Sequence, residues 1–135
     1  MYCNKIVKEQ EEITRFILLD EIARKIKDQE IKEYDEMKEQ MIKDLEDDIK
    51  ALEKKGDHLK LAEFKKAAIE YADWIEEQIE KSKARIEVQS ARFEAMIVHF
   101  DTVDALVKYA ASDDQVRSFF WALRAKADLD RLVIL

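Results

Sequence analysis

Apolar residues recur every three or four positions along most of the chain, a pattern that is typical of long amphipathic helices. The stretch from about residue 5 to residue 55 carries a single apolar stripe. Residues 58–111 repeat apolar side chains at every seventh position, which predicts a coiled-coil helix. A second seam of this repeat contains two polar residues, Ser82 and Gln89. The repeat positions are Ala72, Ile79, Ile86, Phe93, Phe100 and Val107.

A turn separates the two stretches at residues 56 and 57. Gly56 is the only glycine among 135 residues, and the chain contains no proline. Glycine favours the left-handed conformation just past a helix, and Asp57 can cap the helix that follows. If the chain reverses here, facing residues have numbers that add up to 112 or 113, and apolar residues do pair in this way. Examples are Leu52 with Leu61, Ile26 with Ile86 and Leu19 with Phe93.

The stripe has one irregularity, a step of five residues between Ile26 and Ile31, opposite polar Ser82. This step predicts a local stutter in the repeat, and a hinge is the alternative.

A third helix is expected over about residues 113–131. It follows Ser112-Asp113-Asp114-Gln115, which has the form of a capping box. Its apolar face is expected to pack on outer apolar positions of the second helix, namely Val88, Ala95, Val98, Ala105 and Tyr109. The sequence therefore predicts an all-α single domain. In it, a long antiparallel coiled-coil helical hairpin has a three-helix base and a two-helix stalk of about residues 28–84.

Acidic residues are concentrated in the middle of this predicted stalk. Residues 28–48 carry ten acidic residues against three lysines, and residues 70–80 carry five acidic residues and no basic one. Because the pairing places the two segments side by side, they form an acidic band. The bland alternative is a solvated coiled-coil surface without a binding role.

Trp74 lies outside the apolar seam, in the centre of the acidic segment 70–80. An exposed tryptophan among charges is typical of a binding hot spot, whereas the alternative is that Trp74 packs along the hairpin or in a homodimer seam. Trp121 also has no evident cover in the predicted fold. The predicted partner-binding residues are Asp35, Glu36, Glu39, Glu70, Asp73, Trp74, Glu76, Glu77, Glu80 and Trp121.

Residues that would support catalysis or metal binding lack the neighbours they need. Neither His58 nor His99 has carboxylates at the helical spacing of a zinc or di-iron site, and no glycine-rich phosphate loop is present. We therefore expect no enzyme, no metal and no cofactor. Direct nucleic-acid binding is not expected either, because most basic residues are interleaved with acidic ones.

Composition bears on the cellular setting. Cys3 is the single cysteine, so an internal disulfide is excluded and a reducing, cytoplasmic environment is expected. Apolar runs such as residues 132–135 are far shorter than the roughly 20 residues that cross a membrane, so we expect a soluble protein.

Together these features predict a non-catalytic protein-binding coiled-coil module. We expect it to form a homo-oligomer, to bind a protein partner with a basic surface, and to act as an adaptor, assembly factor or scaffold component. The alternative is a small acidic inhibitor, of the kind used in viral counter-defence. Such a protein mimics the phosphate backbone and blocks a basic groove of a nucleic-acid enzyme.

Overall fold

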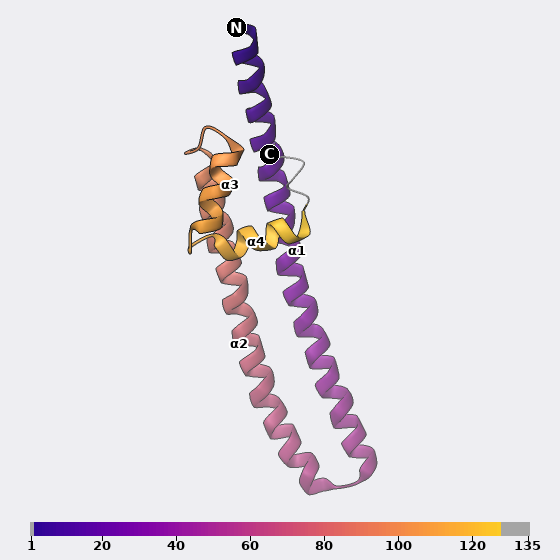
Figure 1. Cartoon of the computed structure of the whole chain (residues 1–135). Helices are drawn as coiled ribbons and strands as arrows, with labels where there is room; N and C mark the ends of the chain where they lie inside the picture. Colours follow the sequence, from indigo (N-terminus) through magenta and orange to yellow (C-terminus); the bar gives the residue numbers. More distant parts are fainter. Residues whose placement is uncertain (1, 128–135) are drawn as a thin grey trace. The chain divides into compact units, whose positions relative to one another are not determined.

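Four helices make up most of the described chain, which comprises the backbone of residues 2–127 and the side chains of residues 8–127. The computed structural model in Figure 1 contains α1 (Tyr2–Lys55), α2 (His58–Ile97), α3 (Val103–Ser112) and α4 (Arg117–Lys126). No strand occurs among residues 2–127, so the predicted all-α class is confirmed.

The chain divides into two compact units. Unit 1 combines residues 1–29 with residues 85–135, and unit 2 comprises residues 30–84. Both long helices, α1 and α2, contribute to both units. For comparison, the stalk predicted from the sequence covers residues 28–84.

The turn in unit 2 follows the local chemistry predicted for it. Gly56 has a positive φ of 73°, which is the left-handed conformation, and its N–H donates to the carbonyl of Glu53. The carboxylate of Asp57 accepts a hydrogen bond of 3.1 Å from the backbone N–H of Lys60. Both the glycine conformation and the aspartate cap are therefore confirmed.

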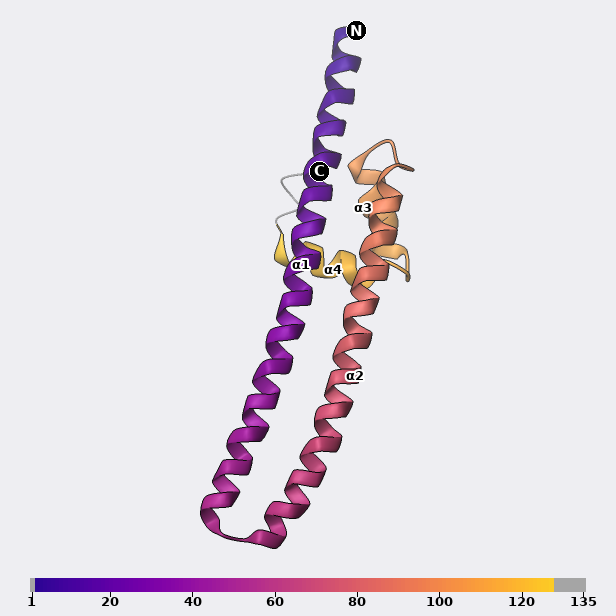
Figure 2. The ribbon, with the colours of Figure 1, turned by 180° about the vertical axis from the view of Figure 1, so that it is seen from behind.

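The parts of α1 and α2 in unit 2 run antiparallel, as the views in Figures 1 and 2 show. Ala68, Ile75 and Ile79 are its buried apolar residues. Three ion pairs join the two helices at successive levels: Lys65–Glu53 at 3.6 Å, Lys38–Glu76 at 3.1 Å and Lys83–Asp35 at 2.8 Å. Coiled-coil packing along the whole of both long helices stays a prediction.

The predicted single helix over residues 58–111 is wrong, because α2 ends at Ile97 and α3 begins at Val103. Thr102 adopts an extended conformation, and its hydroxyl caps α3 by accepting from the N–H of Ala105. The segment 98–102 is rich in β-branched and aromatic residues and includes Asp101, all of them weak helix formers. Such a segment ends one helix, and the capping residue at its end, Thr102, starts the next.

The predicted capping box at residues 112–115 is also wrong. Ser112 is the last residue of α3, and its hydroxyl donates to the carbonyl of Tyr109. Asp113 instead accepts from the N–H of Gln115 in a turn, and Val116 precedes α4 without a side-chain cap. The helix therefore begins at Arg117 rather than at residue 113. Residues 128–131 of the predicted helix lie outside the described residues.

The core of unit 1 is formed by side chains from all four helices, so the predicted three-helix base is incomplete. Its α4 packs on the seam of α2, where the ring of Phe93 lies 5.7 Å from that of Phe119 and 6.5 Å from that of Phe120. The predicted docking surface on α2 stays open instead, with Val88 57% and Val98 81% exposed. The buried cluster comprises Leu19, Ala23, Ile26, Phe93, Val103, Leu106, Ala110, Val116, Phe119, Phe120 and Leu123.

Side chains of the long helices accept hydrogen bonds from backbone N–H groups in the first turns of both short helices. The buried Gln89 of α2 accepts a hydrogen bond of 2.7 Å from the N–H of Phe119 in α4. Glu12 of α1 accepts one of 3.1 Å from the N–H of Val103 in α3. The first N–H groups of a helix have no acceptor within the helix. These two bonds therefore satisfy donors that would otherwise be buried without an acceptor. The hydrogen bond to Phe119 explains why the polar residue Gln89 stands in an otherwise apolar seam.

Candidate protein-binding surface

An exposed aromatic pair lies on α2 within unit 2. The rings of Tyr71 and Trp74 stack with centroids 6.1 Å apart and an interplanar angle of 18°. Trp74 is 57% exposed and Tyr71 is 47% exposed. Their spacing of three residues places them on neighbouring turns of one helix face. We call Tyr71 and Trp74 the aromatic pair.

Acidic side chains border the aromatic pair along α2. Glu70 and Glu77 are four residues before and three residues after Trp74, so both are its neighbours on the helix surface. Glu77 is bound to Lys81 at 2.9 Å. Glu70 and Asp73 are exposed and have no ion pair with any described residue. The aromatic pair therefore lies beside negative charge that the chain itself does not fully neutralise.

Most of the predicted acidic site residues are paired with lysines. Only Glu39, Glu70 and Asp73 of the eight predicted acidic site residues lack an ion pair within the described chain. The other five bind lysines as follows: Glu76 with Lys38, Glu77 with Lys81, Glu36 with Lys32, and both Asp35 and Glu80 with Lys83. The predicted site residues thus form a mixed surface rather than a continuous row of free carboxylates.

Lys83 is the most strongly engaged of these lysines. Its hydrogen bond to Asp35 raises the pKa of the Lys83 amine above its ordinary value, and the nearby Glu80 acts in the same direction, while desolvation opposes both. Lys83 of α2 thus bridges Asp35 of α1 and Glu80 of its own helix.

A second surface of unit 2, which the sequence analysis missed, is an apolar groove of about 320 Å³ between α1 and α2. Ile69, which is 64% exposed, and Ile42 lie along it, with Leu45 and Ala72 among its other lining residues. Five residues separate Ile69 from Trp74, which places them about 140° apart around α2. The sequence contains a signal for this groove, because Ile69 is an apolar residue one position beyond the seam residue Ala68.

Trp121 lies in unit 1 and is engaged within the chain. The centroid of its ring lies 6.0 Å from that of Phe120, with the ring planes inclined at 60°, and the guanidinium carbon of Arg124 lies 5.5 Å from the Trp121 ring centroid. Phe119 and Phe120 are buried, so Trp121 is the one member of this aromatic run with a half-exposed side chain.

The described residues contain no group of three or more His, Cys, Asp or Glu side chains close enough to hold a metal ion. His58 and His99 are both exposed. One carboxylate oxygen of Asp104, in the first turn of α3, is buried without a hydrogen-bond partner among the described atoms.

No helix within residues 2–127 is both long enough and apolar enough to cross a membrane. The chain matches no protein-family model, no curated protein and no solved structure.

Proposed function

We propose that the chain is a non-catalytic protein-binding module and that unit 2 binds its partner through the aromatic pair. The observation that carries this proposal is the exposure of two stacked aromatic rings on a helix whose seam is already filled by Ile75 and Ile79. Tryptophan and tyrosine are enriched at binding hot spots, because burying a large, rigid ring gives much contact area at little entropic cost.

The charges beside the aromatic pair favour a partner with a basic surface. Glu70 and Asp73 have no ion pair in the described chain, so a lysine or arginine of the partner can pair with them. An arginine can also stack on the exposed ring of Trp74. Opposite charges at the rim of an interface accelerate association and exclude wrong partners more than they add affinity.

The fold that we propose for this role is an antiparallel coiled coil formed by the long helices. The three ion pairs between α1 and α2 in unit 2 support this arrangement and its register. Such a pair of helices gives a partner a long surface at a small cost in chain length, as adaptor, assembly and scaffold proteins require.

We also propose that unit 2 self-associates through the groove that Ile69 borders, since exposed apolar side chains of this size favour a partner surface. Light scattering is expected to give a mass above that of one chain at high micromolar concentration. Ile69→Ser is expected to return the mass to that of one chain. Glu39→Gln, at an exposed position without an ion pair in the described chain, is the matched control.

The test of partner binding is affinity capture from a lysate of the source organism, with the intact chain and its Trp74→Ala variant compared side by side. Loss of the captured protein with Trp74→Ala, while Trp121→Ala retains it, supports the proposal. Circular dichroism checks that both variants stay helical. Retention of the same protein by Trp74→Ala contradicts the proposal.

Charge reversal separates this function from the inhibitor alternative. A mimic of nucleic acid depends on its carboxylates. The double variant Glu70→Lys, Asp73→Lys would then abolish capture, Trp74→Ala would leave it unchanged, and the partner would wash off as salt rises. The inhibitor role has less support, because five of the eight predicted acidic residues already bind lysines.

A further inference from the structure

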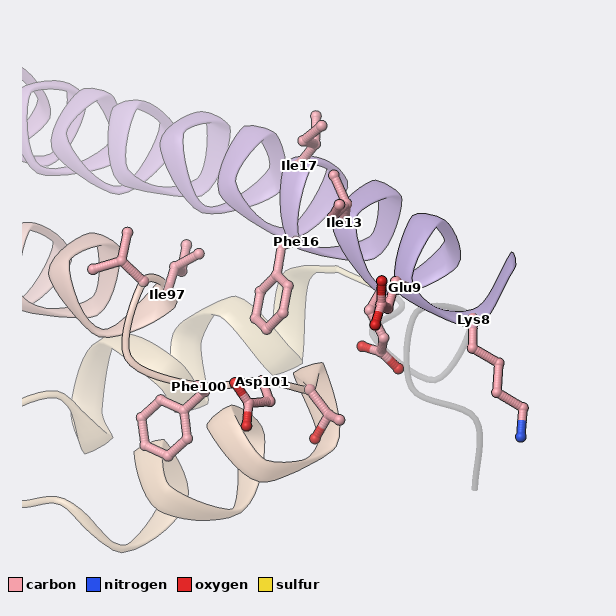
Figure 3. Close-up of a pocket in the computed structure, with 11 residues that line it drawn as sticks. Lys8, Glu9, Ile13, Phe16, Ile17, Ile97, Phe100 and Asp101 are labelled. Atoms are coloured by element: carbon pink, nitrogen blue, oxygen red, sulfur yellow. The ribbon is translucent and has the colours of Figure 1, made fainter. Parts of the chain in front are cut away.

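Unit 1 contains a groove that none of the described residues fills. It has a volume of about 900 Å³ and lies between α1 and the segment that joins α2 to α3. Figure 3 shows Phe16 extending from α1 toward that segment, with Lys8 and Glu9 at one end of the groove. Its apolar lining consists of Ile13, Phe16, Ile17, Ile97, Val98 and Phe100.

The lining residues are exposed to a degree that is unusual for their size. Val98 is exposed over most of its surface, and Ile13 and Ile17 over more than half of theirs. A second hollow shares Phe16, Ile17, Ile97 and Val98 and continues the same apolar surface along α1 and α2. Contiguous exposed apolar surface of this kind is typical of an interaction site.

The sequence that follows α4 supplies a segment of matching chemistry. Residues 128–135 lie outside the described part of the chain, and their sequence is Asp-Leu-Asp-Arg-Leu-Val-Ile-Leu, in which five of eight residues are large and aliphatic. We propose that residues 129–135 of the same chain occupy the groove in unit 1. This proposal is independent of the function proposed for unit 2.

The segment begins at the same core cluster that several groove residues contact. Ala127, the last described residue, packs against the core cluster of unit 1, as do the groove residues Phe16, Ile97 and Phe100. Along α1, Ile13 is six residues, or about 9 Å, from the cluster residue Leu19. Eight residues in extended conformation span up to about 26 Å, so the segment can extend well beyond its point of attachment at this cluster.

Some charges at the groove have a counterpart of opposite sign in the segment. Glu9 and Asp101 line the groove and have no ion pair with other described residues, and Arg131 is the one basic residue of the segment. Lys8, at the same end as Glu9, is available for Asp130. Arg131 can therefore pair with one of these two acidic residues, and Asp130 with Lys8, while the other acidic residue has no counterpart in the segment.

Connection through the chain favours this occupant over a second copy. A segment tethered by a short linker is present at an effective concentration in the millimolar range, far above the micromolar concentration of other copies.

The test is cysteine cross-linking of the full chain in a Cys3→Ser background. Val98→Cys marks the groove at a highly exposed position, and Ile134→Cys marks the segment. A short bis-maleimide is added at low micromolar protein, and the products are separated by mass. The matched control replaces Val98→Cys by Val88→Cys, which exchanges another exposed valine of unit 1 that does not line the groove.

The expected result is an intramolecular cross-link between positions 98 and 134. Its yield should exceed that of the Val88 control by about tenfold or more, as the tethered concentration predicts. Adding Leu132→Asp should reduce the yield toward the control value.

Two outcomes would overturn the proposal. A cross-linked product with the mass of two chains would assign the groove to a second copy. An intramolecular yield equal to that of the Val88 control would show that the segment does not occupy the groove. Circular dichroism of each variant confirms helix content before cross-linking, so neither outcome can arise from unfolding.

Discussion

The two units use the same pair of long helices and yet bury very different amounts of apolar surface. In unit 1, eleven buried apolar residues form one cluster that includes Phe93, Phe119 and Phe120. In unit 2, the buried apolar residues are Ala68, Ile75 and Ile79. The difference lies in the partners that the long helices meet, because α3 and α4 close the core of unit 1 only. Two helices alone bury one stripe each, and unit 2 therefore leaves Ile69 and Trp74 exposed.

The largest effect should come from truncating the core of unit 1. Phe93→Ala removes a fully buried ring that contacts two other rings, and should lower the free energy of unfolding by about 3 to 5 kcal/mol in urea denaturation. Val88→Ala, an exposed position on the same helix, should change it by less than about 0.5 kcal/mol. Equal effects of the two substitutions would mean that the core of unit 1 is placed wrongly.

Removal of the buried hydrogen bond of Gln89 should have the next largest effect on the free energy of unfolding. Gln89→Leu keeps the size of the side chain but leaves the N–H of Phe119 without an acceptor, which should reduce stability by about 1 to 3 kcal/mol. Gln40→Leu, on an exposed position of unit 2, is the control for the exchange of side chains. A stabilised Gln89→Leu variant would contradict the role assigned to this bond.

Hydrogen exchange along α2 compares the two units within one helix. The amides of residues 86–96 should exchange at least about tenfold more slowly than those of residues 62–80, which corresponds to about 1.4 kcal/mol of local opening. The reason is that the first set is covered by the four-helix core and the second by one neighbouring helix. Equal exchange rates for the two sets of amides would contradict the difference in stability expected between the units.

Removing the hydrogen bond by which Glu12 of α1 caps the start of α3 should have a moderate effect on the free energy of unfolding. Glu12→Ala deprives the N–H of Val103 of its acceptor and should reduce stability by about 1 kcal/mol. Glu12→Gln retains an acceptor oxygen and should recover part of that loss. Exchange of the Val103 amide reports the bond directly, and it should accelerate more in the alanine variant than in the glutamine variant.

The smallest effect is expected at the ion pairs of unit 2. Lys83→Met should lower Tm slightly at pH 7, because exposed ion pairs contribute little to stability. Bonding to Asp35 raises the pKa of Lys83 in the folded state, so its contribution is complete below the ordinary lysine pKa of about 10.4. It is lost as the pH rises through the higher folded value. The difference in Tm between the two proteins should therefore shrink above that pH.

The turn that the only glycine marks was predictable from the sequence, whereas the break within the second helix and the bonds between distant residues were not. Gly56 and Asp57 act within one turn of the chain, so their roles follow from residue type. The break after Ile97 was missed because Phe100 and Val103 keep the heptad pattern and no glycine or proline interrupts it.

The cap on α3 was not predictable, because Glu12 and Val103 are 91 residues apart. At the candidate surface, the position of Trp74 outside the seam predicted its exposure. Its stacking on Tyr71 and the pairing of the acids with lysines depend on side-chain geometry that spacing does not fix.

The bond between Glu12 and Val103 has a consequence for how the protein is made. The ribosome synthesises about 5 to 20 residues per second, so Glu12 waits about 5 to 18 s for its partner. The residues of unit 2 emerge as one uninterrupted stretch, and their helices can pair before the second half of unit 1 exists. During that interval, Leu19 and Ile26 lack the helices that later bury them. Unit 1 is thus begun first and completed last, because its cluster is complete only after translation has passed residue 123.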